Sequence, residues 1–183
     1  PTLCAADLIA QAEHDSLARP VLITTSPKIA ADVEAEIHLR LSRLDRSEIA
    51  TKSIETQGLI SIVNNLEEAL ELLNSYAPEH VCIATSDPEK LVPAIKNAGM
   101  VFVGELSHEV LGDYVAGPSH VMPTAGTARF NSGLGVLSFL KAMPVVTIDS
   151  DDSSKLGHVA SVIAREEGLT GHAEAAEIRI ELT

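Results

Sequence analysis

Side chains that could transfer protons or bind a metal occur at several separate places in the sequence. Gln11 and His14 lie three residues apart in a stretch with amphipathic helical spacing, so they would share one helix face and could address the same point in space. This geometry permits a metal site, although a neutral amide is an unusual zinc ligand. Spacing alone therefore favours a solvated helix face over a metal site for this pair.

Glu79 and His80 form an adjacent acid and imidazole directly after Pro78, at the start of a predicted strand. Imidazole titrates near neutral pH, and burial can raise the pKa of a glutamate toward that range, so the two could divide proton-transfer work. Ligands in open α/β sheets gather at the carboxyl ends of strands, and that rule does not favour this position. A catalytic pair and ordinary hydrogen-bonding residues both stay open.

Two further pairs combine a carboxylate with an imidazole. Asp113 and His120 lie in a stretch rich in glycine and proline, and such loops often carry functional groups. Their chemistry suits a divalent metal with nitrogen and oxygen preference, zinc before magnesium. Glu167 and His172 lie between two predicted helices, where capping charges at a helix terminus are the favoured interpretation. The other histidines show no partner pattern and are expected to be structural: His38, His108 and His158.

The composition indicates one α/β domain, or one domain with a small appendage. The chain has 183 residues, of which 45% are hydrophobic, which is enough to bury a core of that size. Its formal charge of −13 would repel a phosphate backbone, so we expect no nucleic-acid partner. No apolar run approaches the roughly 20 residues that cross a bilayer, and we expect a cytoplasmic protein without a membrane partner.

Short aliphatic runs alternate with helix start signals and longer amphipathic stretches. This pattern predicts βα units and a parallel sheet. Strands are expected at residues 21–24, 59–63, 80–84, 100–103 and 145–148, and helices at about 27–44, 64–76, 87–97, 155–167 and 171–179. Asn64 and Glu67 have the spacing of a capping box. Gly99 is suited to a left-handed turn after the helix at 87–97.

The predicted fold class is α/β, with a Rossmann-like parallel sheet flanked by helices as an incomplete domain, followed by a small helical carboxy-terminal tail. The acidic and serine-rich run at 149–154 marks the expected boundary. Residues 1–150 would then form the α/β portion and residues 151–183 the tail. Because the tail is too short to bury a core alone, we expect it to pack on the main domain or on a partner subunit.

Four segments together resemble the carboxy-terminal part of histidinol dehydrogenase, and the likeness extends over essentially the whole chain. They are ADL through QAEHD at 6–15, APEH at 77–80, GDYVAGPSHVMPTAGTARFNSGL at 112–134, and EGLTGH at 167–172. The third segment is long and unusual in composition, which argues against chance agreement.

The resemblance implies a role for most of the residues above. The implied zinc ligands are Gln11, His14, Asp113 and His172, the implied acid/base pair is Glu79 and His80, and the implied substrate contacts are His120 and Glu167 together with His80 and the four zinc ligands. Gln11, His14, Asp113 and the acid/base pair would then lie in residues 1–150, and His172 would lie in the tail. For Gln11, the resemblance reverses the interpretation that spacing alone favoured.

The resemblance also implies a reaction and an assembly. Members of this family convert L-histidinol to L-histidine, a reaction of histidine biosynthesis, in two successive NAD-dependent oxidations. His80 would take the alcohol proton, Glu79 would activate the water that hydrates the aldehyde, and Zn²⁺ would orient the substrate. Similar proteins are homodimers whose carboxy-terminal tail reaches the partner's active site, which agrees with a tail that cannot form a core.

The sequence departs from the family pattern in length, because family members are more than twice as long. We therefore expect a fragment whose NAD-binding residues are not identified here. The glycine cluster at 132–138 lacks the third glycine of a dinucleotide fingerprint. Alternative functions are a paralogous dehydrogenase of another small alcohol, such as a sulfonated diol, a non-catalytic zinc-dependent dimerisation module, or a structural fragment without metal. The presence of both His120 and Glu167 favours histidinol.

We predict that the pure 183-residue polypeptide does not oxidise histidinol, because it lacks much of the NAD site that the family implies. The measurement is NADH absorbance with histidinol and NAD. Measurable NADH formation by the pure chain would contradict the prediction.

Overall fold

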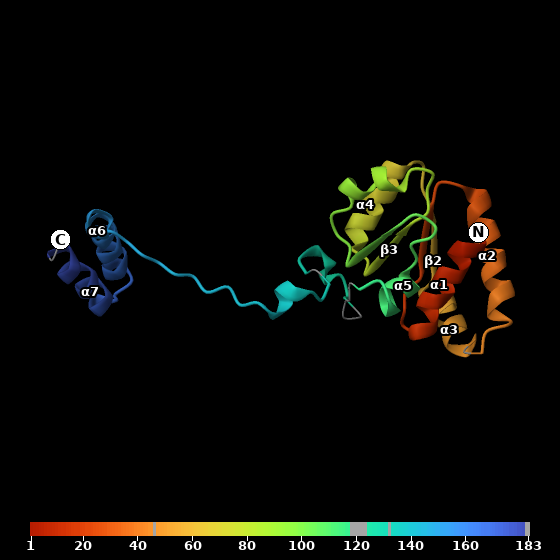
Figure 1. The fold of residues 1–183 in the computed structure, drawn as a ribbon, viewed down its shortest axis with the longest axis horizontal. Helices are drawn as coiled ribbons and strands as arrows, with labels where there is room; N and C mark the ends of the chain where they lie inside the picture. The colour runs from red at the N-terminus through yellow and green to blue at the C-terminus, as the bar shows by residue number, and fades with distance from the viewer. Residues whose placement is uncertain (46, 118–123, 132, 182–183) are drawn as a thin grey trace. The chain divides into compact units, whose positions relative to one another are not determined.

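The computed structural model describes residues 1–45, 47–117, 124–131 and 133–181 (Figure 1). The chain divides into two compact units, Pro1–Phe139 and Leu140–Thr183, and each is described by itself. No helix within the described ranges is both long and apolar enough to cross a membrane. The assignment of 1–150 and 151–183 to functional domains stays a prediction.

The first unit combines helices with short strands and 3₁₀ turns. Its helices are α1 (Thr2–His14), α2 (Pro27–Leu41), α3 (Ser47–Gln57), α4 (Leu66–Tyr76) and α5 (Glu109–Tyr114); its strands are β1 (Val21–Thr24), β2 (Leu59–Ile62), β3 (His80–Ile83) and β4 (Met100–Val103); its 3₁₀ turns are η1 (Pro88–Lys90), η2 (Val92–Ala94), η3 (Thr127–Arg129) and η4 (Val136–Phe139). The first four predicted strands are confirmed to within one residue.

The four strands form two parallel pairs. β1 pairs with β2 in the register Val21 to Leu59, and β3 pairs with β4 in the register His80 to Met100. Parallel strands need a crossover connection, which helices α2 and α3 provide for the first pair. Short parallel strands flanked by helices confirm the predicted α/β class.

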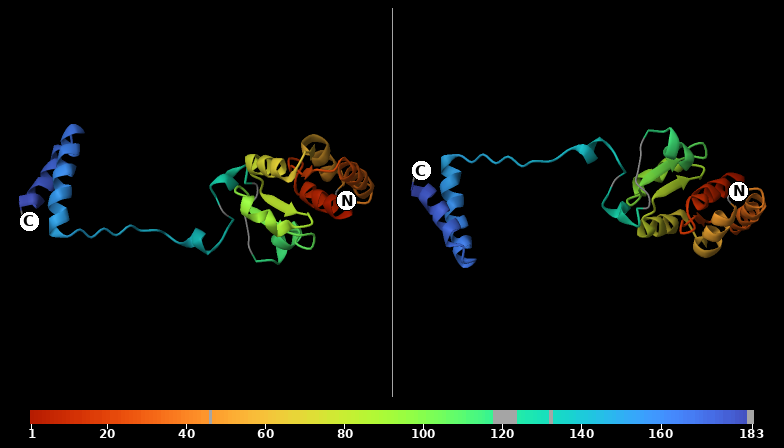
Figure 2. Two further views of the ribbon diagram at one scale, coloured as in Figure 1. Left: turned by 90° about the horizontal axis from the view of Figure 1, so that it is seen from above. Right: turned by 90° about the horizontal axis from the view of Figure 1, so that it is seen from below.

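The main core lies among the first three helices, which Figure 2 shows grouped at one end of the unit. Its buried side chains are Ala5, Ile9, Ala12, Val33, Ile37, Leu41 and Ala50. The alanines of α1 allow close approach of its neighbours. Ser53 is fully buried on α3, and its hydroxyl donates to the Ala18 carbonyl at 2.9 Å. This bond fastens α3 to the segment that leads into β1.

Two helix starts show how local sequence sets the fold. The Ser26 hydroxyl accepts from the Ile29 amide at 3.3 Å and caps α2. The cap of α4 is one residue later than predicted, because the side chain of Asn65 accepts from the Glu68 amide at 2.8 Å. The Glu68 carboxylate reaches back to the Asn64 amide at 2.8 Å. The predicted spacing between the cap residue and the glutamate is therefore confirmed, but both residues lie one position later than predicted.

Three other expectations are wrong. Residues 87–97 form the turns η1 and η2 in place of a helix, since Pro93 supplies no amide hydrogen. Gly99 does not have a positive φ angle. Residues 145–148 form no strand, because β-branched residues make a strand only with a neighbour to pair with. The sequence also did not predict α3, which follows a short break after α2.

The second unit is a pair of helices, α6 (Ser150–Glu166) and α7 (Thr170–Glu181). The side chain of Asp149 accepts from the Asp152 amide at 2.9 Å and starts α6. Arg165 binds Glu177 through two nitrogens at 2.9 and 2.7 Å, and Ser161 donates to the same carboxylate. These bonds from Ser161 and Arg165 hold the pKa of Glu177 below its usual value. The predicted helical tail is confirmed.

We predict that Ile37→Ala lowers the free energy of unfolding by about 2–4 kcal/mol, because it leaves a cavity in the core of the first three helices. Ile37 is 5% exposed. The matched control is Leu39→Ala on the same helix, where the side chain is 46% exposed and the expected loss is below about 1 kcal/mol. Urea unfolding of the three proteins measures the difference. Equal losses would contradict this placement of the core.

Candidate active site

The site is built where α1 and α5 meet. His14 lies at the end of α1, and its Nε2 atom is 3.7 Å from Oδ2 of Asp113 on α5. Gln11 is one helical turn before His14 and therefore on the same face of α1. Residues from two distant parts of the sequence, α1 and α5, are thus brought to one region of the first unit.

His80 begins β3 and is buried beside the same two helices. Its Nδ1 atom lies 3.4 Å from Oε1 of Gln11 and 3.4 Å from Oε2 of Glu109. The side chains of His80 and Glu109 are only 5% and 6% exposed. The Phe102 ring meets the imidazole edge-on, with 5.6 Å between the ring centroids. The orientation of His80 is therefore fixed by α1, α5 and β4 together.

The backbone around Glu79 is held by its neighbours. The amides of Gly99 and Met100 donate to the carbonyls of Pro78 and Glu79 at 3.0 and 2.8 Å. A Cβ atom on Gly99 would lie 2.6 Å from the Glu79 carbonyl oxygen, so this close approach requires glycine. The Glu79 carboxylate accepts from the Thr124 amide at 3.3 Å.

The turn that leads into this segment has an unusual conformation. Ala77 closes α4 with a left-handed backbone, at φ 56° and ψ 63°, and its amide donates to the Leu73 carbonyl at 2.9 Å. Left-handed geometry costs a non-glycine residue roughly 1 kcal/mol. Ala77 is 2% exposed, and its surroundings hold it in place. The chain thereby passes from α4 to Glu79 and His80 in a sharp turn.

The distance between the side chains of His14 and Asp113 is compatible with two ligands of one divalent metal ion. Two ligands of a tetrahedral zinc, each at 2.0–2.2 Å, lie roughly 3.4 Å apart. The 3.7 Å between Nε2 and Oδ2 is near that separation and longer than an ordinary hydrogen bond. No group of three or more His, Cys, Asp and Glu side chains with suitable geometry occurs among the described residues.

The family follows from comparison with known proteins. A family model described as histidinol dehydrogenase matches residues 1–180. The chain belongs to this family. It is 47% identical over 178 residues to the histidinol dehydrogenase of Dehalococcoides mccartyi strain CBDB1, a match that covers 97% of this chain and 41% of that protein.

Another relative and a solved structure agree. A histidinol dehydrogenase of Thermus thermophilus is 48% identical over 179 residues, covering 98% of this chain and 43% of that protein. The crystal structure of histidinol dehydrogenase from Elizabethkingia anophelis matches with a TM-score of 0.86 at 32% identity, covering 99% of this chain and 42% of that chain. The chain spans about two fifths of the length of these relatives and matches their carboxy-terminal part.

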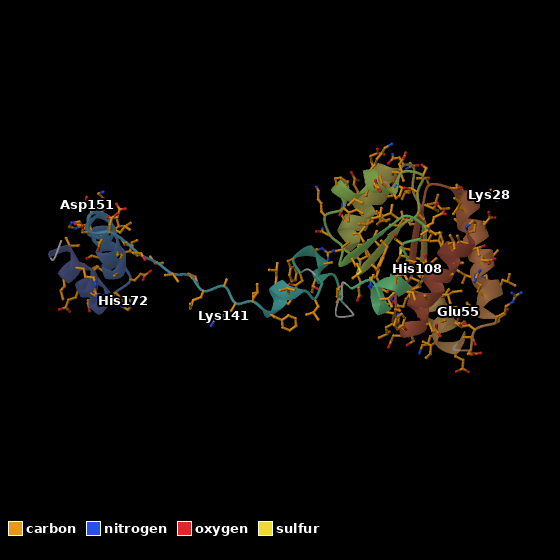
Figure 3. The ribbon with its side chains drawn as sticks, in the orientation of Figure 1. Lys28, Glu55, His108, Lys141, Asp151 and His172 are labelled. Atoms are coloured by element: carbon orange, nitrogen blue, oxygen red, sulfur yellow. The ribbon has the colours of Figure 1, made fainter. Side chains whose placement is uncertain are left out.

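Five of the expected site residues lie in the first unit, where contacts link Gln11 to His80 and His14 to Asp113, and two lie in the second unit. Gln11, His14, Glu79, His80 and Asp113 are those of the first unit. Glu167 caps the end of α6 and is exposed. His172 lies in the first turn of α7 and is also exposed (Figure 3). His120 lies outside the described residues.

Glu109 is a residue of this region that the sequence did not reveal. It is the first residue of α5, directly after the N-cap residue His108, and an acid in the first turn of a helix is ordinary, because it interacts well with the helix dipole. One signal was present: Glu109 precedes Asp113 by four residues, so the two share a helix face. Without knowledge of α5, that spacing carried no weight.

A separate pocket of about 280 Å³ lies at the carboxyl ends of β3 and β4. Asp7, Cys82 and Gly104 are among its lining residues. Burial, and then the charge of Glu109, raises the pKa of Asp7, although His108 opposes this. Burial also raises the pKa of the Cys82 thiol to about 12, so this thiol is a poor nucleophile at neutral pH. The pocket lies at the opposite end of β3 from His80.

We predict that Gly112→Ala destabilises the protein by about 1–3 kcal/mol, through overpacking. The new Cβ would lie 2.5 Å from Cζ of Phe102, whose ring is buried against His80. The control is Gly135→Ala, where no atom of the described residues would lie within 4 Å of the new Cβ and the expected change is within about 0.5 kcal/mol. Thermal unfolding compares the two variants. Equal stability would show that Phe102 can move aside freely.

Proposed function

We propose that this chain carries the metal and proton-transfer residues of a histidinol dehydrogenase, a cytoplasmic enzyme of histidine biosynthesis that oxidises L-histidinol to L-histidine with NAD and Zn²⁺. The observation that carries the proposal is the convergence of α1, α5 and the start of β3. It brings Gln11 to 3.4 Å from His80 and His14 to 3.7 Å from Asp113. Family membership supplies the reaction that this set of side chains would serve.

In this proposal, Gln11, His14 and Asp113 hold zinc together with His172. The first three belong to one unit, where the separation of His14 from Asp113 suits two ligands of one ion. An amide, imidazoles and a carboxylate are a borderline donor set that zinc accepts. When bound, zinc would orient the amino and imidazole groups of the substrate relative to the reacting carbon.

His80 would act as the base in the first oxidation. Its buried ring, held at Nδ1, can take the alcohol proton while the hydride leaves from carbon. NAD would accept the hydride in both oxidations, and we assign no residue of this chain to its site. Glu79, the residue before His80 in the chain, would take a proton from the water that adds to the aldehyde, and the Thr124 amide holds its carboxylate.

The second unit would dock on a partner subunit and deliver His172 and Glu167 to the partner's site. Helix α6 exposes four aliphatic side chains to water, which is unfavourable for an isolated helix pair. They are Leu156 (54%), Val159 (57%), Val162 (63%) and Ile163 (53%). Covering them in a homodimer would remove this surface from water. Zinc affinity would then depend on dimerisation.

We predict that His14→Ala and Asp113→Asn, made in a full-length enzyme carrying this sequence, each lower zinc content and turnover, because each removes a ligand. Elemental analysis and NADH formation from histidinol measure both effects. The control is His38→Ala on the exposed face of α2, which should keep full zinc content and turnover. Full zinc content in both ligand variants would rule out the proposed metal site.

We predict that the two acid/base residues affect different steps. Glu79→Gln should lower oxidation of the aldehyde histidinal by about 10²–10⁴-fold and affect the oxidation of histidinol to histidinal less, since only the second step consumes water. His80→Asn should lower alcohol oxidation by a similar factor. Stopped-flow NADH formation from each substrate separates the steps. Equal effects of Glu79→Gln on both steps would contradict this division.

A further inference from the structure

Glu109 is a buried acid that the proposed chemistry does not yet use. Its residue is 5% exposed at the start of α5, and burying a carboxylate without compensation is costly. Its Oε2 atom lies 3.4 Å from Nδ1 of His80. Its Oε1 atom is buried and makes no hydrogen bond within the described part of the chain. The carboxylate is therefore directed at the imidazole.

We propose that Glu109 is a positioning residue that holds the ring of His80 and keeps its proton on Nδ1. This inference rests on the proposed function, in which His80 is the base. Oε2 of Glu109 and Oε1 of Gln11 are both acceptors that face Nδ1, and a neutral imidazole carries one N–H. Acceptors at Nδ1 favour the tautomer with its lone pair on Nε2, the nitrogen that would take the alcohol proton.

The carboxylate contributes what the amide of Gln11 cannot. A carboxylate oxygen is the stronger acceptor, and it also stabilises the imidazolium that forms when His80 takes the proton. Gln11 is in addition a proposed zinc ligand, so its oxygen would be shared. Both 3.4 Å separations are long for hydrogen bonds, and such bonds often tighten only in the substrate complex.

Helix α5 carries the proposed positioning residue and a proposed zinc ligand on the same face. Glu109 and Asp113 are four residues apart on a helix of six residues, Glu109–Tyr114, so both point toward α1 and the start of β3. Glu109 contacts His80 and Asp113 contacts His14. One short helix would thus set the position of the base relative to the metal.

The kinetic test uses Glu109→Ala and Glu109→Gln in a full-length enzyme carrying this sequence. Glu109→Ala should lower kcat for histidinol oxidation on the order of 100-fold, with KM changed less than about threefold, because the ring loses its orientation and not its substrate contacts. Glu109→Gln can still offer an acceptor oxygen to Nδ1 and should recover part of that loss.

Ser53→Ala is the matched structural control, because it removes a buried hydrogen bond on α3, outside the site. It should lower thermal stability and leave kcat unchanged. If Glu109→Ala fails to fold, Glu109→Gln decides the matter: a kcat equal to that of the wild type, with an unchanged His80 tautomer, overturns the proposal.

A second readout needs neither substrate nor NAD. In protein with ¹⁵N-labelled histidine rings, NMR should show the proton of His80 on Nδ1, assigned by the signal that His80→Asn removes. Glu109→Gln should weaken this preference, and Glu109→Ala should move the proton toward Nε2. A tautomer unaffected by both substitutions overturns the proposal. If the wild-type enzyme does not oxidise histidinol, the proposed function fails, whereas normal wild-type turnover with unimpaired Glu109 variants defeats only this inference.

Discussion

The burial of one imidazole between two helices organises the first unit. His80 starts a strand, and its ring is enclosed by side chains from α1, α5 and β4. A polar ring in this position is stable only with hydrogen-bonding partners, because an unpaired buried polar group costs about 1–3 kcal/mol. Gln11 and Glu109 satisfy this requirement, and in doing so they fix how α1 and α5 approach each other. That approach also places His14 beside Asp113.

The arrangement places acidic side chains close together in a region that is shielded from water. Asp7 and Glu109 are close enough that the charge of Glu109 contributes to the raised pKa of Asp7. In the proposed enzyme a divalent cation beside Asp113 would offset part of this negative charge. The polar site and the hydrophobic core also share an element, since α1 contributes Gln11 and His14 to the first and Ala5, Ile9 and Ala12 to the second.

Sequence reasoning reached the strands and the helix that carry most of the site, because short aliphatic runs and capping residues act locally. It failed where structure depends on a distant partner. The β-branched run at 145–148 has strand propensity, but no strand in the described part of the chain pairs with it. The role of Gly99 also depends on a distant residue, since its hydrogen atom allows close approach to the Glu79 carbonyl. The contacts of Gln11 and Glu109 with His80 also join segments far apart in the sequence, so spacing within one segment could not predict them.

Because Gly112 packs against Phe102, the side-chain sizes that fit at these two positions depend on each other. The absent side chain at 112 leaves room for the aromatic ring, and that ring touches His80. The two positions therefore form a volume pair: a larger residue at 112 becomes acceptable when 102 is smaller, as with alanine facing leucine. Such a compensated pair would restore packing but remove the aromatic edge contact. Covariation between these positions in evolution would accordingly record a compromise between stability and control of the imidazole.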